Sequence, residues 1–123
     1  MDKIRVLVAN RPRLMRELVL ATIADQPDIE IMGEIKQDSE IAQVAAEAHP
    51  DFVIIALDTP AVRPAICDAL FGHNPQIKIL ALAPEHNNSV LFWSLLDIHS
   101  VRVESSEAGI LNALRGKAVA VSQ

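Results

Sequence analysis

Phe52-Val53-Ile54-Ile55-Ala56-Leu57 is apolar at every position, and this stretch decides the fold. A strand buried on one face alternates apolar and polar residues, whereas an uninterrupted apolar run of this length is typical of a strand covered on both faces. Such strands occupy the centre of parallel sheets, where helices lie on either side. The run therefore predicts an α/β domain in which residues 52–57 form a central strand.

Four further runs rich in β-branched residues surround this one. Together the five runs start at positions 4, 29, 52, 77 and 101, a spacing that leaves room for one helix and two short loops between successive strands. In the second run Glu30 and Glu34 alternate with apolar residues, which predicts a strand at the edge of the sheet. The five predicted strands are Ile4–Ala9, Ile29–Ile35, Phe52–Leu57, Ile77–Ala83 and Val101–Val103.

Between the runs, apolar residues recur with the period of a helix. A serine or aspartate suits the start of a helix and a glycine its end, so Ser106 begins the last helix, Gly116 ends it, and Gly72 ends the third. The pattern predicts a (βα)₅ domain over residues 1–117, followed by a tail at 118–123. The five predicted helices cover residues 14–22, 38–48, 62–71, 88–97 and 106–115.

The predicted fourth helix is apolar in nearly every direction. Phe92, Trp93 and Leu96 belong to a run in which Ser94 is the one polar residue at the centre. A helix on one face of a single sheet cannot bury all of its sides. We therefore expect part of it to form an interaction surface, together with Val101 of the predicted fifth strand.

Composition narrows the class of function. The net charge is −5 and the pI is about 5.2, which disfavours direct binding to nucleic acid or to an anionic membrane. The single Cys67 has no partner for an internal disulfide, and no apolar run approaches the length of a membrane span. The sequence predicts one cytoplasmic domain. It has no glycine-rich phosphate loop, so no nucleotide cofactor is expected.

Several motifs resemble the receiver domain of two-component response regulators, especially receivers that precede a helix-turn-helix domain. The resemblance lies in residues 4–11, in Leu14-x-Arg16-Glu17-Leu18, in residues 26–34 and in residues 49–55. It covers almost the whole chain. It implies a flavodoxin-like three-layer sandwich with a parallel five-stranded sheet in the order 2-1-3-4-5.

In a working receiver, carboxylates hold Mg²⁺ beside an acceptor aspartate, and a hydroxyl and a lysine hold the phosphoryl group. The resemblance places other residue types at each of these positions. Alanine has no nucleophile, arginine brings a cation to the metal position, and glutamate brings an anion to the lysine position. The degenerate pocket comprises Asn10 and Arg11 for the acidic pair, Ala56 for the acceptor with Asp58 two residues later, Ala83 for the hydroxyl and Glu104 for the lysine.

Asp58 could be a displaced phosphoryl acceptor or a residue that caps a turn. The arginines of this region could bind an anion at the vacant pocket or form ordinary surface ion pairs. We expect Arg11 to reach Asp58 or Glu104, because a cation in a former metal pocket needs an anionic neighbour. The arginines concerned are Arg11, Arg13, Arg16 and Arg63; the four histidines lack metal-ligand spacing, so no metal site is expected.

These observations predict a pseudo-receiver, a receiver fold without the phosphoacceptor. We expect a regulatory module that is not an enzyme and that binds proteins independently of phosphorylation, as in a part of a transcriptional regulator. Its expected partner is a second copy, bound through the fourth helix, fifth strand and fifth helix, or else a heterologous signalling protein. The alternative is a sensor that binds a small ligand in the vacant phosphorylation pocket.

Overall fold

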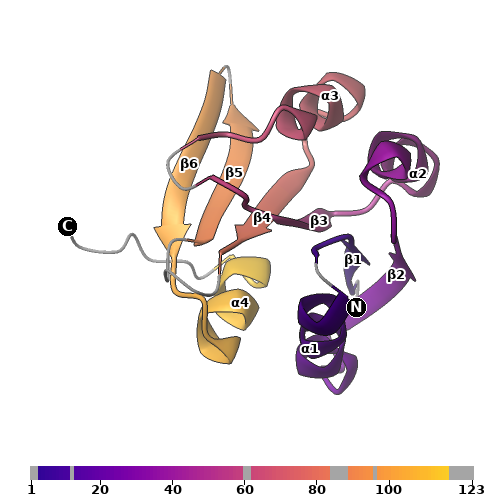
Figure 1. Cartoon of the computed structure of the whole chain (residues 1–123), viewed down its shortest axis with the longest axis vertical. Coiled ribbons are helices and arrows are strands. Elements are labelled where there is room, and N and C mark those ends of the chain that lie inside the picture. The colour runs from indigo at the N-terminus through magenta and orange to yellow at the C-terminus, as the bar shows by residue number, and fades with distance from the viewer. Residues whose placement is uncertain (1–2, 12, 60–61, 84–88, 96, 117–123) are drawn as a thin grey trace.

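A six-stranded mixed sheet in the order β2-β1-β3-β4-β5-β6 forms the middle layer of the domain (Figure 1). The computed structural model describes residues 3–11, 13–59, 62–83, 89–95 and 97–116. β1 pairs in parallel with β2 and β3, and β3 pairs in parallel with β4. The strands are β1 (Ile4–Val8), β2 (Ile29–Glu34), β3 (Phe52–Ala56), β4 (Lys78–Leu82), β5 (Ser89–Leu95) and β6 (Asp97–Val103).

Helices cover both faces of this sheet. α2 and α3 pack on one face, and α1 and α4 pack on the other, so the domain has the three layers that the sequence predicts (Figure 1). The helices are α1 (Arg13–Ala24), α2 (Ile41–Ala48), α3 (Ile66–His73) and α4 (Glu107–Leu114), and a short 3₁₀ helix, η1 (Asp38–Glu40), precedes α2.

β3 lies inside the sheet, as its apolar sequence predicts. Phe52 and Ile54 join the core beneath α1 and α4, whereas Val53 and Ile55 join the core beneath α2 and α3. Each of these four residues is buried. The prediction that the alternating second run lies at an edge is also confirmed, because β2 ends the sheet next to β1.

The predicted fourth helix at 88–97 is wrong, because residues 89–95 form strand β5. A short apolar run has no period that separates a strand from a buried helix segment. As a strand, the run places neighbouring residues on opposite faces, so both faces can be buried. Val90 and Phe92 pack toward α2 and α3, and Leu91 and Trp93 pack toward α1 and α4. This arrangement buries apolar groups that a helix would have exposed.

The all-parallel, five-stranded sheet is therefore also wrong. β5 is antiparallel to β4, and β6 is antiparallel to β5. Val101–Val103 is the end of the longer strand β6 and not a separate parallel strand. Two successive reversals give β6 the direction of β4, so its carboxyl end still lies at the same edge as those of β1, β3 and β4.

The structure confirms the predicted start of the last helix and corrects both ends of the third. Ser106 caps α4, with its Oγ accepting the backbone N–H of Gly109 at 3.0 Å. α3 starts at Ile66, later than predicted, and it continues through Gly72.

Cys67 is a buried core residue of α3, and burial raises the pKa of its thiol to about 12. The predicted tail at 118–123 lies outside the described residues.

Two helical glycines give opposite expectations for substitution by alanine. A Cβ at Gly109 would clash with the backbone oxygen of Glu104, whereas a Cβ at Gly72 would meet no atom within 4 Å. We expect Gly109→Ala to lower the free energy of unfolding by about 2 kcal/mol, because backbone must move. Gly72→Ala should raise it by about 0.5 kcal/mol, because alanine restricts the unfolded chain. Urea unfolding of both variants checks this pair, and equal effects would contradict it.

Candidate functional site

The candidate pocket lies at the carboxyl edge of the sheet. β1, β3, β4 and β6 all run in one direction and end there. In open α/β sheets this edge is where ligands bind. The structure brings to it all six residues predicted for the degenerate pocket, which end or follow these strands: Asn10, Arg11, Ala56, Asp58, Ala83 and Glu104.

Arg11 bridges two carboxylates at this edge, which confirms the expected contact with Asp58. Its Nη2 and Nη1 donate to the two Asp58 carboxylate oxygens at 2.9 and 3.3 Å. Its Nε donates to Asp38 Oδ1 at 3.0 Å. These hydrogen bonds raise the pKa of the Arg11 guanidinium, with Asp58 as the larger cause and Asp38 as the second. The guanidinium is therefore a fixed cation that joins β1, η1 and the loop after β3.

This geometry does not fit a Mg²⁺ ion. Magnesium binding needs carboxylate oxygens free to turn toward the metal. Here the carboxylates of Asp38 and Asp58 already face Arg11. The ion pairs are solvent-exposed, and exposed pairs contribute only about 0–1 kcal/mol. Their effect is on the shape and charge of the edge more than on stability.

The other arginines considered for an anion site each pair with a separate carboxylate. Arg13 contacts Glu17 at 3.0 Å and Arg63 contacts Asp68 at 3.1 Å. Arg16 is buried and pairs with Glu34 at the end of β2. The arginines of this region are thus distributed among local ion pairs, and the structure does not gather them around one anion site.

Asn10 and Ala56 occupy the remaining positions of β1 and β3. Asn10 is 1% exposed, and its Oδ1 has no hydrogen-bond partner among the described residues. Ala56 ends β3 opposite Leu82 of β4 and presents only a methyl group. Neither the Asn10 side chain nor the Ala56 side chain is a nucleophile or an anion, so neither could accept a phosphoryl group.

A cluster of hydroxyls that the sequence does not reveal fills the position beside Ala83. Ser89 Oγ is fully buried, accepts the backbone N–H of Ala83 at 3.0 Å and lies 2.6 Å from Ser105 Oγ. Ser105 Oγ also donates to the Ala83 carbonyl oxygen at 3.4 Å. This hydroxyl cluster (Ser89, Ser105 and the Ala83 backbone) ties β4, β5 and β6 together. Its members follow no sequence motif, because the hairpin turn brings Ser105 back beside Ser89.

Glu104 does not join Arg11. Its carboxylate accepts the Ser106 hydroxyl at 3.4 Å, and its backbone oxygen lies against Gly109 in the first turn of α4. Glu104 therefore belongs to the local start of α4.

The predicted interaction surface lies on the β5–β6 hairpin and not on a helix. Phe92 is buried toward α2 and α3, while Trp93 and Val101 are half-buried on the opposite face. The Trp93 and His99 rings stack across the hairpin, with centroids 5.6 Å apart. Leu96 lies outside the described residues.

Fold and site together define an α/β domain with a mostly parallel sheet that begins β2-β1-β3-β4 and ends in an antiparallel hairpin. No protein-family model matches the chain, and no curated protein sequence matches it significantly. No helix in the described part of the chain is long and apolar enough to cross a membrane. The same part contains no group of three or more histidine, cysteine or acidic side chains arranged to hold a metal ion.

The Arg16–Glu34 pair predicts a pH dependence of stability. A hydrogen bond from Arg16 is the largest cause that lowers the pKa of Glu34. A carboxyl whose pKa is lower in the folded state stabilises the protein above its unfolded pKa, and this contribution is lost as the pH falls through the folded pKa. Between about pH 6 and about pH 3 the wild type should therefore lose more unfolding free energy than Glu34→Gln.

Urea unfolding across this pH range measures the difference. Glu30→Gln is the matched control, because Glu30 is exposed on the same strand and lies outside the pair. It should follow the wild type. A Glu34→Gln variant that also follows the wild type would show that the pair does not contribute to acid sensitivity.

Proposed function

We propose that this chain is a phosphorylation-independent regulatory module of receiver type, which acts by binding a second copy of itself through the β5–β6 hairpin. The observation that carries the proposal is the open outer edge of this hairpin. Within the described residues, no strand pairs with the outer side of β6. An exposed edge strand presents unpaired backbone groups to another chain.

The residue types at the carboxyl edge support independence from phosphorylation. Ala56 stands where the resemblance places the acceptor, and Arg11 holds Asp38 and Asp58 where a receiver would hold its metal. The Arg11 guanidinium is always positively charged, whereas a working receiver gains positive charge at this place only when it binds Mg²⁺. The proposal is that the domain has one permanent signalling state.

The two edges of the sheet differ in how well they are protected. Natural proteins protect edge strands with charged residues, prolines and bulges. β2 carries Glu30 and Glu34, and its pairing with β1 shifts register between Val6 and Leu7. β6 is seven residues long, contains no proline and pairs with β5 in continuous register. β6 also carries two charged residues, Asp97 and Arg102, but its edge lacks the register shift that interrupts β2, so it is the more regular of the two edges.

The outer half of the hairpin also extends beyond the rest of the sheet. β4 pairs with β5 at Val90–Phe92, whereas β5 pairs with β6 from Ser89 to Leu95. Among the described strands, the segment from Trp93 outward has only β6 beside it. Two-stranded ribbons are marginally stable by themselves. A further strand along β6 would widen this ribbon and cover more of the half-buried Trp93.

A second copy is the partner whose chemistry this edge fits. Antiparallel pairing of β6 with β6 around a two-fold axis satisfies the same backbone groups on both chains, and two-fold dimers are the commonest assemblies. β6 carries one acidic and one basic residue, Asp97 and Arg102, so two copies meet without a net charge on this strand. The proposed surface replaces the helical one that the sequence predicts.

The alternative of a ligand in the vacant phosphorylation pocket receives less support. Arg11 and its two carboxylates already contact one another across the strand ends. A ligand there would have to compete with these ion pairs.

Incubation with acetyl phosphate and Mg²⁺ tests the phosphorylation step. Intact-mass measurement should show no added phosphoryl group on the wild type. Ala56→Asp restores an acceptor carboxylate but not a metal site, so it should also stay unmodified. A stable adduct mapped to Asp58 of the wild type would contradict the proposal.

Sedimentation equilibrium tests the dimer. We expect the wild type to self-associate at about 100 μM, as it would with a Kd of ~10 μM. Ser100→Lys should give a monomer, because Ser100 is exposed in the middle of β6 and lysines on an edge strand prevent pairing. Gln43→Lys on α2 makes the same charge change away from the edge, so it should leave the dimer intact. A monomeric wild type, or a dimer that Ser100→Lys does not alter, would contradict the proposal.

A further inference from the structure

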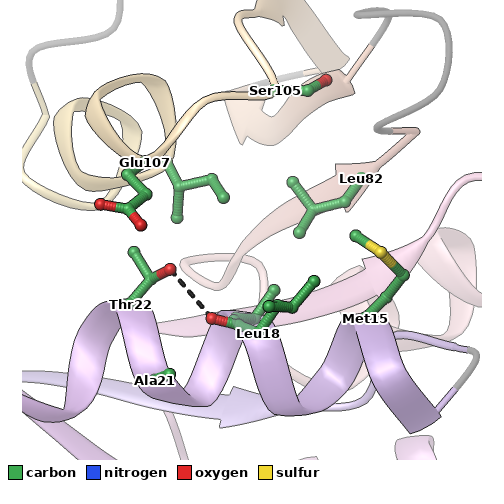
Figure 2. A pocket seen from close by; sticks show the side chains of 9 residues that line it. Met15, Leu18, Ala21, Thr22, Leu82, Ser105 and Glu107 are labelled. Carbon is green, nitrogen blue, oxygen red and sulfur yellow. Dashed lines mark hydrogen bonds between the residues drawn. The ribbon is translucent and has the colours of Figure 1, made fainter.

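A cavity of about 290 Å³ separates α1 from α4 on one face of the sheet (Figure 2). Side chains of the two helices point toward each other across it, and Leu82 of β4 lies behind them. Since a water molecule occupies about 30 Å³ in the liquid, the space equals about ten waters. It lies on the opposite face of the sheet from α2 and α3.

The inner end of this cavity is apolar. Val19, Leu82 and Ile110 line it and are themselves buried. The outer wall includes Leu18, a residue that remains 52% exposed. Water in such a space finds few hydrogen-bond partners, and ligand sites in proteins are typically concave and mostly apolar with a few polar groups. An apolar group of matching size would gain contacts on several sides.

Some polar groups of the cavity already make hydrogen bonds within the protein, and others do not. Thr22 Oγ1 donates to the Leu18 carbonyl oxygen at 2.9 Å, and Ser105 Oγ belongs to the hydroxyl cluster with Ser89. Glu107 is the one charged residue among the nine that line the cavity, and it makes no ion pair with any described residue. Figure 2 shows its carboxylate beside Thr22. The polar group of the cavity that remains available to a ligand is therefore the Glu107 carboxylate, an anion.

We propose that this cavity binds a small organic cation, an amine with a compact apolar body. The apolar body would lie against Val19, Leu82 and Ile110, and the ammonium group would pair with the Glu107 carboxylate. Charge complementarity favours this class over an acid, because an anionic ligand would meet Glu107 with no basic residue in the lining. This proposal does not depend on the dimer and goes beyond the proposed function.

Titration with phenethylamine, followed by amide chemical shifts in NMR, tests the site. Phenethyl alcohol is the neutral probe of the same shape. We expect both to shift amides around the cavity, with the amine binding about threefold more tightly at low salt, because the Glu107 side chain is exposed and exposed ion pairs are weak. Added salt should reduce the advantage of the amine, because salt screens a partly exposed ion pair.

Two variants and their controls locate the contacts. Glu107→Gln should remove the advantage of the amine and leave the alcohol unchanged, while Glu30→Gln on β2 should change neither. Leu18→Ala should weaken both probes several-fold. Leu14→Ala is its matched control, because Leu14 is 65% exposed on the same helix and does not line the cavity.

Thermal unfolding without a probe verifies that each variant is folded. The proposal is overturned if the wild type binds the amine and the alcohol equally, or if neither saturates by about 10 mM, weaker than the millimolar affinity expected of such a small ligand. It is also overturned if Glu107→Gln retains the full advantage of the amine. That result would mean that the amine binds elsewhere on the acidic surface.

Discussion

Burial of β3 on both faces is the constraint on which the other layers depend. Its side chains alternate between two cores, one beneath α1 and α4 and the other beneath α2 and α3. Because both cores must be closed, the chain has to place helices on each side and strands on each flank of β3. Every described strand end at the carboxyl edge, and thus the position of Arg11 beside Asp58, follows from that arrangement.

The carboxyl edge lies where open α/β sheets bind ligands. The groups that lie there are an amide, a methyl group and a cation that is already paired, and a buried hydroxyl cluster holds the neighbouring strand ends together. Individually, exposed ion pairs here contribute little energy. Together, the contacts of Arg11 with Asp38 and Asp58 join η1 and the loop after β3 to the end of β1. We propose that the sheet edge at β6 and the cavity between α1 and α4 are the places where other molecules bind.

The strands and helices up to β4 could be predicted because their patterns have distinct periods. The apolar run at Phe52 and the alternation at Glu30 each fit one position in a sheet. Arg11 could be placed beside Asp58 because both follow strands that end at one edge. Residues 89–95 were wrongly predicted to form a helix, since a short apolar run suits a buried helix and a two-faced strand equally. The Ser89 and Ser105 contact was equally hidden, because it depends on the hairpin that the periodicity does not reveal.

The hairpin that replaces the expected helix changes how the chain can fold. β4, β5 and β6 pair with their neighbours in sequence, and antiparallel hairpins form on the microsecond timescale. β1, β2 and β3 instead pair across helical crossovers, and such non-local pairings form more slowly because loop closure costs entropy before contacts repay it. The two halves of one sheet thus differ in contact order. The carboxyl-terminal half can serve as a rapidly formed template to which the edge of β3 is added.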